Sequence, residues 1–167
     1  MRVRIGWLGT AALLALLSFS TTASGKEEKI PLDKVPKAVM DTVKARFKEA
    51  TVVGSAIEET EDGKTVYEIS LKAKDKTIDI ILTPAGKIVL FEQSIAQGDL
   101  PKAVAKTLAD KYAQATFKRL EQVFTVVDGK EKLDFYEVLL VTDKKELLEV
   151  KLAVDGKVQS AKAADPE

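Results

Sequence analysis

The sequence predicts an α+β fold, built as a tandem repeat of one helix plus a four-stranded antiparallel meander, with the helices on one face of the sheet or sheets. Three observations predict it: two similar amphipathic segments, matching turn sequences after each, and alternating apolar residues between the turns. The segments read VPKAVMDTVKARFKEAT from residue 35 and LPKAVAKTLADKYAQAT from residue 100. We expect a signal peptide over residues 1–25, a first repeat over 26–93, and a second over 94–167 that ends in a short tail.

Each amphipathic segment predicts a helix, over residues 36–49 and 101–113. An apolar residue recurs every four positions in the first segment, at Val35, Val39, Val43 and Phe47. This spacing places the apolar side chains in one stripe, and a proline in the first turn is compatible with a helix because its missing N–H would have no helical partner. Such a stripe indicates core packing rather than a ligand site.

The segments after each helix have the period of strands. In the first half, Tyr67, Ile69 and Leu71 alternate with polar residues, and Asp62-Gly63 supplies a tight turn. Further strands are expected over 78–82 and 88–92 in the first half, and over 120–127, 135–142, 147–153 and from 157 in the second. Tight turns require antiparallel neighbours. The two units, joined by residues 94–99, could also pair edge to edge into a longer sheet.

The first 25 residues are typical of a secretory signal peptide. Arg2 and Arg4 precede an apolar run from Ile5 to Phe19, and small residues follow, with cleavage expected after Ala23 or Gly25. An uncleaved membrane anchor is the alternative, but a spanning helix needs roughly 20 apolar residues. No cysteine follows the run, so the chain is not a lipoprotein. We expect a periplasmic or secreted protein with no stable membrane insertion after cleavage.

The composition excludes several classes of site. The chain has no cysteine and no histidine, which rules out disulfides, thiolate nucleophiles, Cys/His zinc sites and haem ligation by either residue. The 26 basic and 26 acidic residues balance, so no overall positive field favours nucleic acid. We expect no cofactor, no metal and no nucleic-acid partner.

Two groups of residues are candidates for catalysis or metal binding. Glu68, Ser70 and Lys72 share one strand face, and a Ser/Lys pair can act as nucleophile and base, but an open sheet face offers nothing to lower the pKa of the lysine. An acidic run could offer oxygen ligands to calcium, at Glu58, Glu59, Glu61 and Asp62. It lacks the calcium-loop spacing, and consecutive strand carboxylates point to opposite faces. Residue types alone would permit a glycosidase carboxylate pair, but nothing marks a cleft. We therefore expect no enzyme.

The pattern (V/L)PKAV, an aromatic near the helix end, DGK followed by YE(I/V)xL, and a closing GK(I/V) resembles the PepSY-like domain family. The resemblance covers both copies, from about Ile30 to Ser160. It implies the fold of the β-lactamase inhibitor protein, itself a tandem repeat of helix plus four-stranded sheet, in an exported bacterial protein. It also implies binding or inhibition of a partner. The inhibitor proteins are held together partly by disulfides and this chain has none, so their target is not carried over.

The two predicted halves differ most on the sheet face away from the helices. In the first half this face is expected to carry Glu68, Ser70, Lys72 and Asp79. In the second half we expect an apolar partner-binding face formed by Phe135, Leu139, Val141 and Leu147, with Val123 and Val127 nearby. Apolar patches rimmed by charge often mark interaction surfaces. The alternative is that the chain itself covers this face, since a strand buried on both sides has the same pattern.

Three functional hypotheses follow. The first is an exported, non-catalytic binding module, an inhibitor or regulator of an envelope or secreted enzyme. The second is a structural or chaperone-like periplasmic protein that self-associates through the same apolar face. The third is an enzyme that uses carboxylates or the Ser/Lys pair. The partner is a protein or a second copy of the chain, and its identity is not specified by the sequence.

Overall fold

The computed structural model describes residues 28–60 and 62–164, and the predicted signal peptide lies outside them. Within the described residues, nine strands form one antiparallel sheet and are hydrogen-bonded in their sequence order. The strands are β1 (Glu28–Lys29), β2 (Thr51–Glu59), β3 (Thr65–Ala73), β4 (Lys76–Leu82), β5 (Ile88–Ser94), β6 (Thr116–Val127), β7 (Lys130–Val141), β8 (Leu147–Ala153) and β9 (Val158–Ala163). The helices of this part of the chain are η1 (Leu32–Lys34), α1 (Lys37–Arg46), η2 (Gln97–Asp99) and α2 (Lys102–Lys111), where η marks a 3-10 helix.

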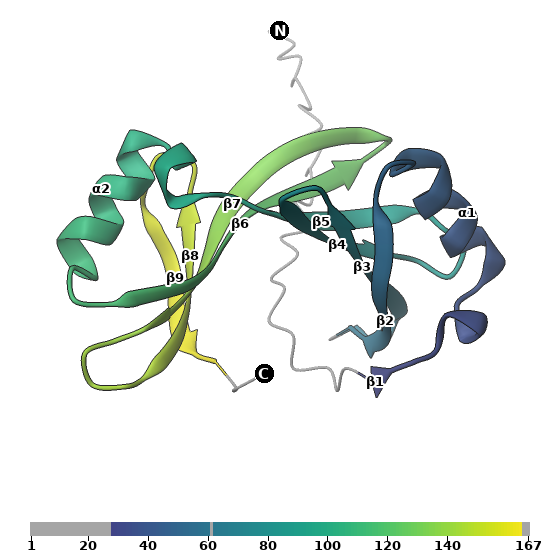
Figure 1. Ribbon diagram of the computed structural model, residues 1–167, viewed down its shortest axis with the longest axis horizontal. Helices are drawn as coiled ribbons and strands as arrows, with labels where there is room; N and C mark the ends of the chain where they lie inside the picture. Colours follow the sequence, from purple (N-terminus) through teal and green to yellow (C-terminus); the bar gives the residue numbers. More distant parts are fainter. Residues whose placement is uncertain (1–27, 61, 165–167) are drawn as a thin grey trace, which may run out of the picture.

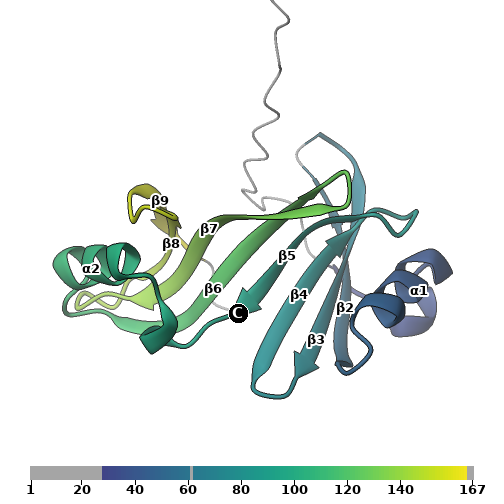
Figure 2. The ribbon, with the colours of Figure 1, turned by 90° about the horizontal axis from the view of Figure 1, so that it is seen from above.

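The sheet bends into an arch, and the two α-helices lie on its outer side at opposite ends (Figure 1). Viewed from above, α1 lies beside β2 and β3, whereas α2 lies beside the β7–β9 end (Figure 2). The inner side of the arch carries no helix of the described chain. We call this side the helix-free face.

Each helix covers its own apolar core. Under α1, Val39 and Val43 are buried against apolar side chains of β3, β4 and β5. Under α2, Val104 and Leu108 are buried against side chains of β7 and β8. Both helices are shorter than predicted and end at Arg46 and Lys111, before the aromatic residues that follow. Because strand side chains alternate between faces, the residues that do not enter these cores point to the helix-free face.

The predicted fold class, a tandem repeat of helix plus four-stranded meander, is wrong. The described chain forms one continuous nine-stranded sheet, in which β5 pairs with β6 from Leu90↔Thr125 to Ser94↔Glu121. The prediction relied on tight turns, which specify pairing only between strands that a turn joins directly. The β5–β6 pairing instead joins strands on either side of η2 and α2.

The length of the β6–β7 hairpin explains why the sheet is continuous. Each of its strands has 12 residues, against 9 in β2 and β3. The added length carries Phe124 and Val126 to the core under α1. At the hairpin, Glu131 also forms an ion pair with Arg46 of α1. Core residues of the first half are therefore supplied by strands of the second.

Two glycines set how closely the helices approach the sheet. Gly86 and Gly156 lie in turns with φ of +79° and +85°, which favour glycine. A Cβ at Gly86 would lie 2.4 Å from the Ala38 carbonyl oxygen, and one at Gly156 would lie 2.5 Å from that of Ala103. Each helix backbone thus rests directly against a turn of the sheet.

Candidate functional site

Charged residues form a row across the helix-free face. Asp79 of β4 lies directly opposite Glu92 of β5, and Glu121 of β6 lies directly opposite Glu137 of β7. Like charges placed opposite each other in antiparallel strands are destabilising. The row continues to Lys151 of β8, which lies opposite Glu137. An arrangement that costs stability at the centre of a sheet marks the row as a candidate functional site.

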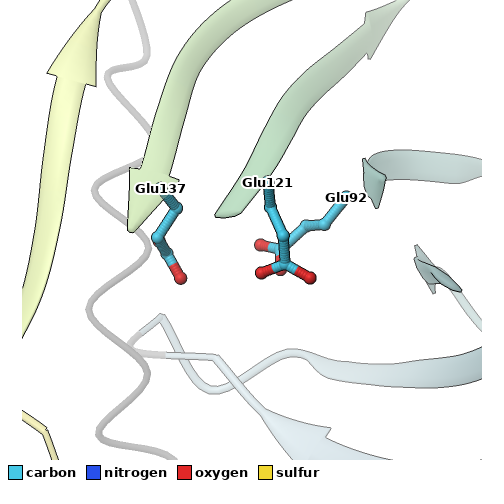
Figure 3. Close-up of side chains that lie close together, drawn as sticks. All are labelled: Glu92, Glu121 and Glu137. Carbon is cyan, nitrogen blue, oxygen red and sulfur yellow. The ribbon is translucent and has the colours of Figure 1, made fainter. Parts of the chain in front are cut away.

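Three carboxylates of the row converge. One carboxylate oxygen from each of Glu92, Glu121 and Glu137 lies within 4.8 Å of the others. Figure 3 shows the three side chains extending to the same side of their strands. Glu121 is 2% exposed and Glu137 is 8% exposed, whereas Glu92 is partly buried. We call these residues the carboxylate cluster.

Two basic side chains contact the carboxylate cluster. The Arg119 Nε lies 2.9 Å from a Glu121 carboxylate oxygen, and the Lys151 Nζ lies 3.2 Å from one of Glu137. Lys151 also lies 3.6 Å from Glu149, the next acidic residue of β8 on the same face. Within the described chain, the structure shows no ion pair or hydrogen bond to the Glu92 carboxylate, although the charge of Arg119 acts on it.

The environment shifts the protonation of the carboxylate cluster. Burial raises the pKa of Glu92 well above its ordinary value of 4.5, and the charges of Glu137 and Glu121 raise it further. Burial also raises the pKa of Glu137, while the positive charge of Lys151 opposes this shift. Glu92 and Glu137 therefore bind protons more tightly than exposed glutamates do.

A small apolar group borders the carboxylate cluster on the same face. Leu90, Val123 and Phe135 are buried together, and Ile81 packs against them. The Lys151 Nζ lies 4.9 Å from the centre of the Phe135 ring, close enough for a cation–π contact. The centre of the helix-free face thus combines negative charge with apolar surface.

The spacing of the carboxylate cluster is compatible with a metal ion, but its partners are not. In the described part of the chain it is the one group of three or more acidic residues with ligand atoms at suitable spacing. A cation there would compete with Arg119 and Lys151, which already contact two of the three carboxylates. Because two of the three carboxylates already have a basic partner, we assign no metal to the cluster.

The structure places all four residues of the predicted partner-binding face. Val141 and Leu147 are a direct cross-strand pair, and Leu139 is two residues from Val141 on β7. All three are partly exposed. Phe135 is buried in the middle of the same strand, with Glu137 between it and Leu139. The face is therefore two apolar areas separated by charge, rather than one patch.

Of the two residues expected near this face, Val123 is buried beside Phe135, whereas Val127 lies exposed at the end of β6. On the first half of the sheet, Ser70 lies opposite Asp79 and Lys72 lies opposite Thr77. No basic group is paired with the Ser70 hydroxyl among the interactions the structure describes.

The described residues of the acidic run before the first hairpin, Glu58, Glu59 and Asp62, are not among the acidic side chains that the structure brings together. Glu58 and Glu59 are consecutive on β2, and Glu61 is outside the described residues. Asp62 accepts a hydrogen bond from the Thr60 hydroxyl and pairs with Lys64, and these contacts lower the pKa of its carboxyl.

Sequence reasoning missed Glu92 and Glu121. The alternation of β4 and β5 was enough to place Glu92 on the same face as Asp79. Glu121 could not be joined to it, because the β5–β6 pairing that brings them together is not a hairpin.

Comparison with known proteins supports the fold and part of the family resemblance. Residues 21–90 match the family described as "Putative beta-lactamase-inhibitor-like, PepSY-like". The match covers the first half of the chain, so two tandem copies of the family domain are not confirmed. No curated protein matches the sequence significantly.

Several solved structures from Bacteroides species share the fold. A Bacteroides eggerthii protein described as "putative periplasmic" has a TM-score of 0.62 and 13% identity, over 77% of this chain and 88% of that one. A BLIP-like protein from Bacteroides fragilis has a TM-score of 0.57 and 15% identity, over 83% and 90%. A DUF2874 family protein from Bacteroides uniformis has a TM-score of 0.60 and 14% identity, over 77% and 88%. No helix in the described residues is long and apolar enough to span a membrane.

Proposed function

We propose that the chain is an exported, non-catalytic binding module that holds a protein partner against the helix-free face, as an inhibitor or regulator of an envelope or secreted enzyme. The observation that carries the proposal is the row of like charges on this face, which is unfavourable for folding and is bordered by apolar side chains. The similarity to a beta-lactamase-inhibitor-like family and to structures described as periplasmic supports the class of function and the compartment.

The charge of the face defines the chemistry of the partner. Two of the three carboxylates of the cluster contact a basic group, so the centre of the face carries net negative charge when all three are ionised. A lysine or arginine of the partner, flanked by apolar side chains, complements it. The partly exposed Leu139, Val141 and Leu147 provide the neighbouring apolar contacts.

Site-specific photo-crosslinking in the native compartment tests the proposal. A crosslinker at Val141 should capture a discrete partner, whereas one at Leu32, which is 46% exposed in η1, should not. The double variant Leu139→Lys and Val141→Lys should stay folded and lose the crosslink from a neighbouring position, and raised salt should weaken capture. Unfolding of the double variant would show that these residues belong to the core, and equal capture from both positions would also contradict the proposal.

Light scattering distinguishes a foreign partner from a second copy of the chain. A monomer at low micromolar concentration is expected under the proposal. A stable homodimer that the double variant abolishes would instead support the self-associating periplasmic protein.

A further inference from the structure

The carboxylate cluster has more acidic groups than the basic groups in contact with it. Three carboxylates converge within 4.8 Å, and Arg119 and Lys151 are the two cations in contact with them in the described chain. Lys151 is also shared with Glu149, so its charge is divided between two carboxylates. Full ionisation would place three negative charges within 4.8 Å of one another among buried and half-buried side chains, which is unfavourable.

Glu92 is the carboxylate with the least compensation. The groups that face it are Asp79 of β4, Arg119 and Glu121 of β6, Glu137 of β7 and, beyond Glu137, Lys151 of β8. Arg119 is already paired with Glu121 and Lys151 with Glu137. A proton is the smallest cation that can neutralise charge at this point. Carboxylates this close titrate as a coupled group, in which the first to be protonated keeps its proton to a higher pH than an isolated glutamate does.

We propose that Glu92, Glu121 and Glu137 form a proton-binding cluster, in which the three carboxylates hold one proton in common at pH values where isolated glutamates are ionised. The negative charge of the helix-free face and the stability of the sheet then both depend on pH. The raised pKa of Glu92 and that of Glu137 agree with this arrangement. The proposal concerns the free protein and does not depend on a partner.

The sign of the pH dependence follows from proton linkage. The folded state binds the proton more tightly than the unfolded state, where Glu92 has its ordinary pKa of 4.5. The stability that this group contributes is fully present below that value and is lost as the pH rises through the folded-state pKa. Each unit by which the folded pKa is raised corresponds to about a tenfold change in the unfolding equilibrium constant.

Urea unfolding of the wild type and of Glu92→Gln across about pH 4 to 9 tests the proposal, in buffers with a chelator so that protons are the only ligand. The glutamine is isosteric with the protonated acid. The variant should match the wild type at about pH 4 and have an unfolding constant at least about tenfold lower at about pH 8. Glu146→Gln, in the exposed turn between β7 and β8, is the matched control and should follow the wild type throughout.

Parallel pH profiles for the wild type and Glu92→Gln would overturn the proposal. Should Glu92→Gln fail to fold, side-chain carboxyl NMR of the wild-type protein decides the question. At least one glutamate of the cluster should titrate well above its ordinary value of 4.5, and this titration should also shift the carboxyl signals of the other two. Titration of all three near the ordinary glutamate value would overturn the proposal by itself.

Discussion

Phe91 of β5 and Phe124 of β6 stack face to face, with ring centres 4.8 Å apart and an angle of 8° between the ring planes. Phe91 is buried in the core under α1, and Phe47 at the end of α1 meets it edge-on. The stack joins strands that lie on either side of α2 in the sequence. It therefore ties the second half of the sheet into the core of the first, and we expect the described sheet to unfold as one unit.

Replacement of Phe124 by alanine tests this coupling. The variant loses the ring stack and leaves a void beside Phe91, so it should be destabilised by about 2–3 kcal/mol, less than a fully buried phenylalanine because the ring is partly exposed. Urea unfolding followed by circular dichroism should still show one transition. Val127→Ala, at an exposed position of the same strand, should change stability by less than about 0.5 kcal/mol. Two transitions, only one of them shifted, would show that the halves unfold independently.

The ion pair between Arg46 and Glu131 should contribute little to the stability of the fold, because both side chains are more than a third exposed. The Arg46 guanidinium carbon also lies 5.5 Å from the centre of the Phe47 ring and 5.7 Å from that of Phe91. Arg46→Ala should therefore lower the free energy of unfolding more than Glu131→Ala does, by about 0.5–1 kcal/mol. A double-mutant cycle measured by urea unfolding should give a coupling energy under about 1 kcal/mol. Equal effects of the two single variants would show that the ring contacts contribute nothing.

Alanine substitution of three glycines distinguishes the stability lost to an unfavourable φ from the stability lost to a steric clash with a helix. Gly129 has a φ of +73° and open space around it, so Gly129→Ala should cost only about 1 kcal/mol for the unfavourable φ. Gly86→Ala and Gly156→Ala should each cost about 1–3 kcal/mol more, because the added methyl group meets a helix carbonyl. Thermal unfolding checks the order. Similar losses of stability at all three positions would show that the helices can move away from the turns at no cost in free energy.

Features set by neighbours in the chain could be predicted from the sequence. The stripe of Val39 and Val43 and the proline before it predict a helix at α1, and the turn at Gly86 follows from the glycine between apolar strands. The edge-to-edge pairing that makes the sheet continuous was one of two arrangements that the sequence allowed. The sequence did not select it, because the pairing of β5 with β6 is specified by neither a turn nor a short motif.

The candidate site could be predicted only in part from the sequence, for the same reason. Leu139 and Val141 could be placed on the helix-free face from alternation along one strand. The carboxylate cluster needs the alignment of three strands, and a bulge between Val123 and Phe124 changes which β6 side chains face inward. Alternation alone therefore could not bring Glu92 and Glu121 to one point.

Lys151 should stabilise the helix-free face in a pH-dependent way. Its Nζ is 3.2 Å from Glu137, the Lys151 side chain is 13% exposed, and Lys151→Met would remove the charge while keeping most of the packing. The pKa of Glu137, already raised by burial, should rise further without Lys151. The variant should lose about 3 kcal/mol at about pH 8, and the loss should shrink towards pH 4, because protonated Glu137 needs no cation. Urea unfolding at both pH values measures this loss.

The control is Lys162→Met, which removes a more exposed partner of Glu149. It should lower the free energy of unfolding by less than about 1 kcal/mol at either pH. A loss for Lys151→Met that is the same at both pH values would mean that the lysine acts through packing on Phe135 rather than through the charge of Glu137.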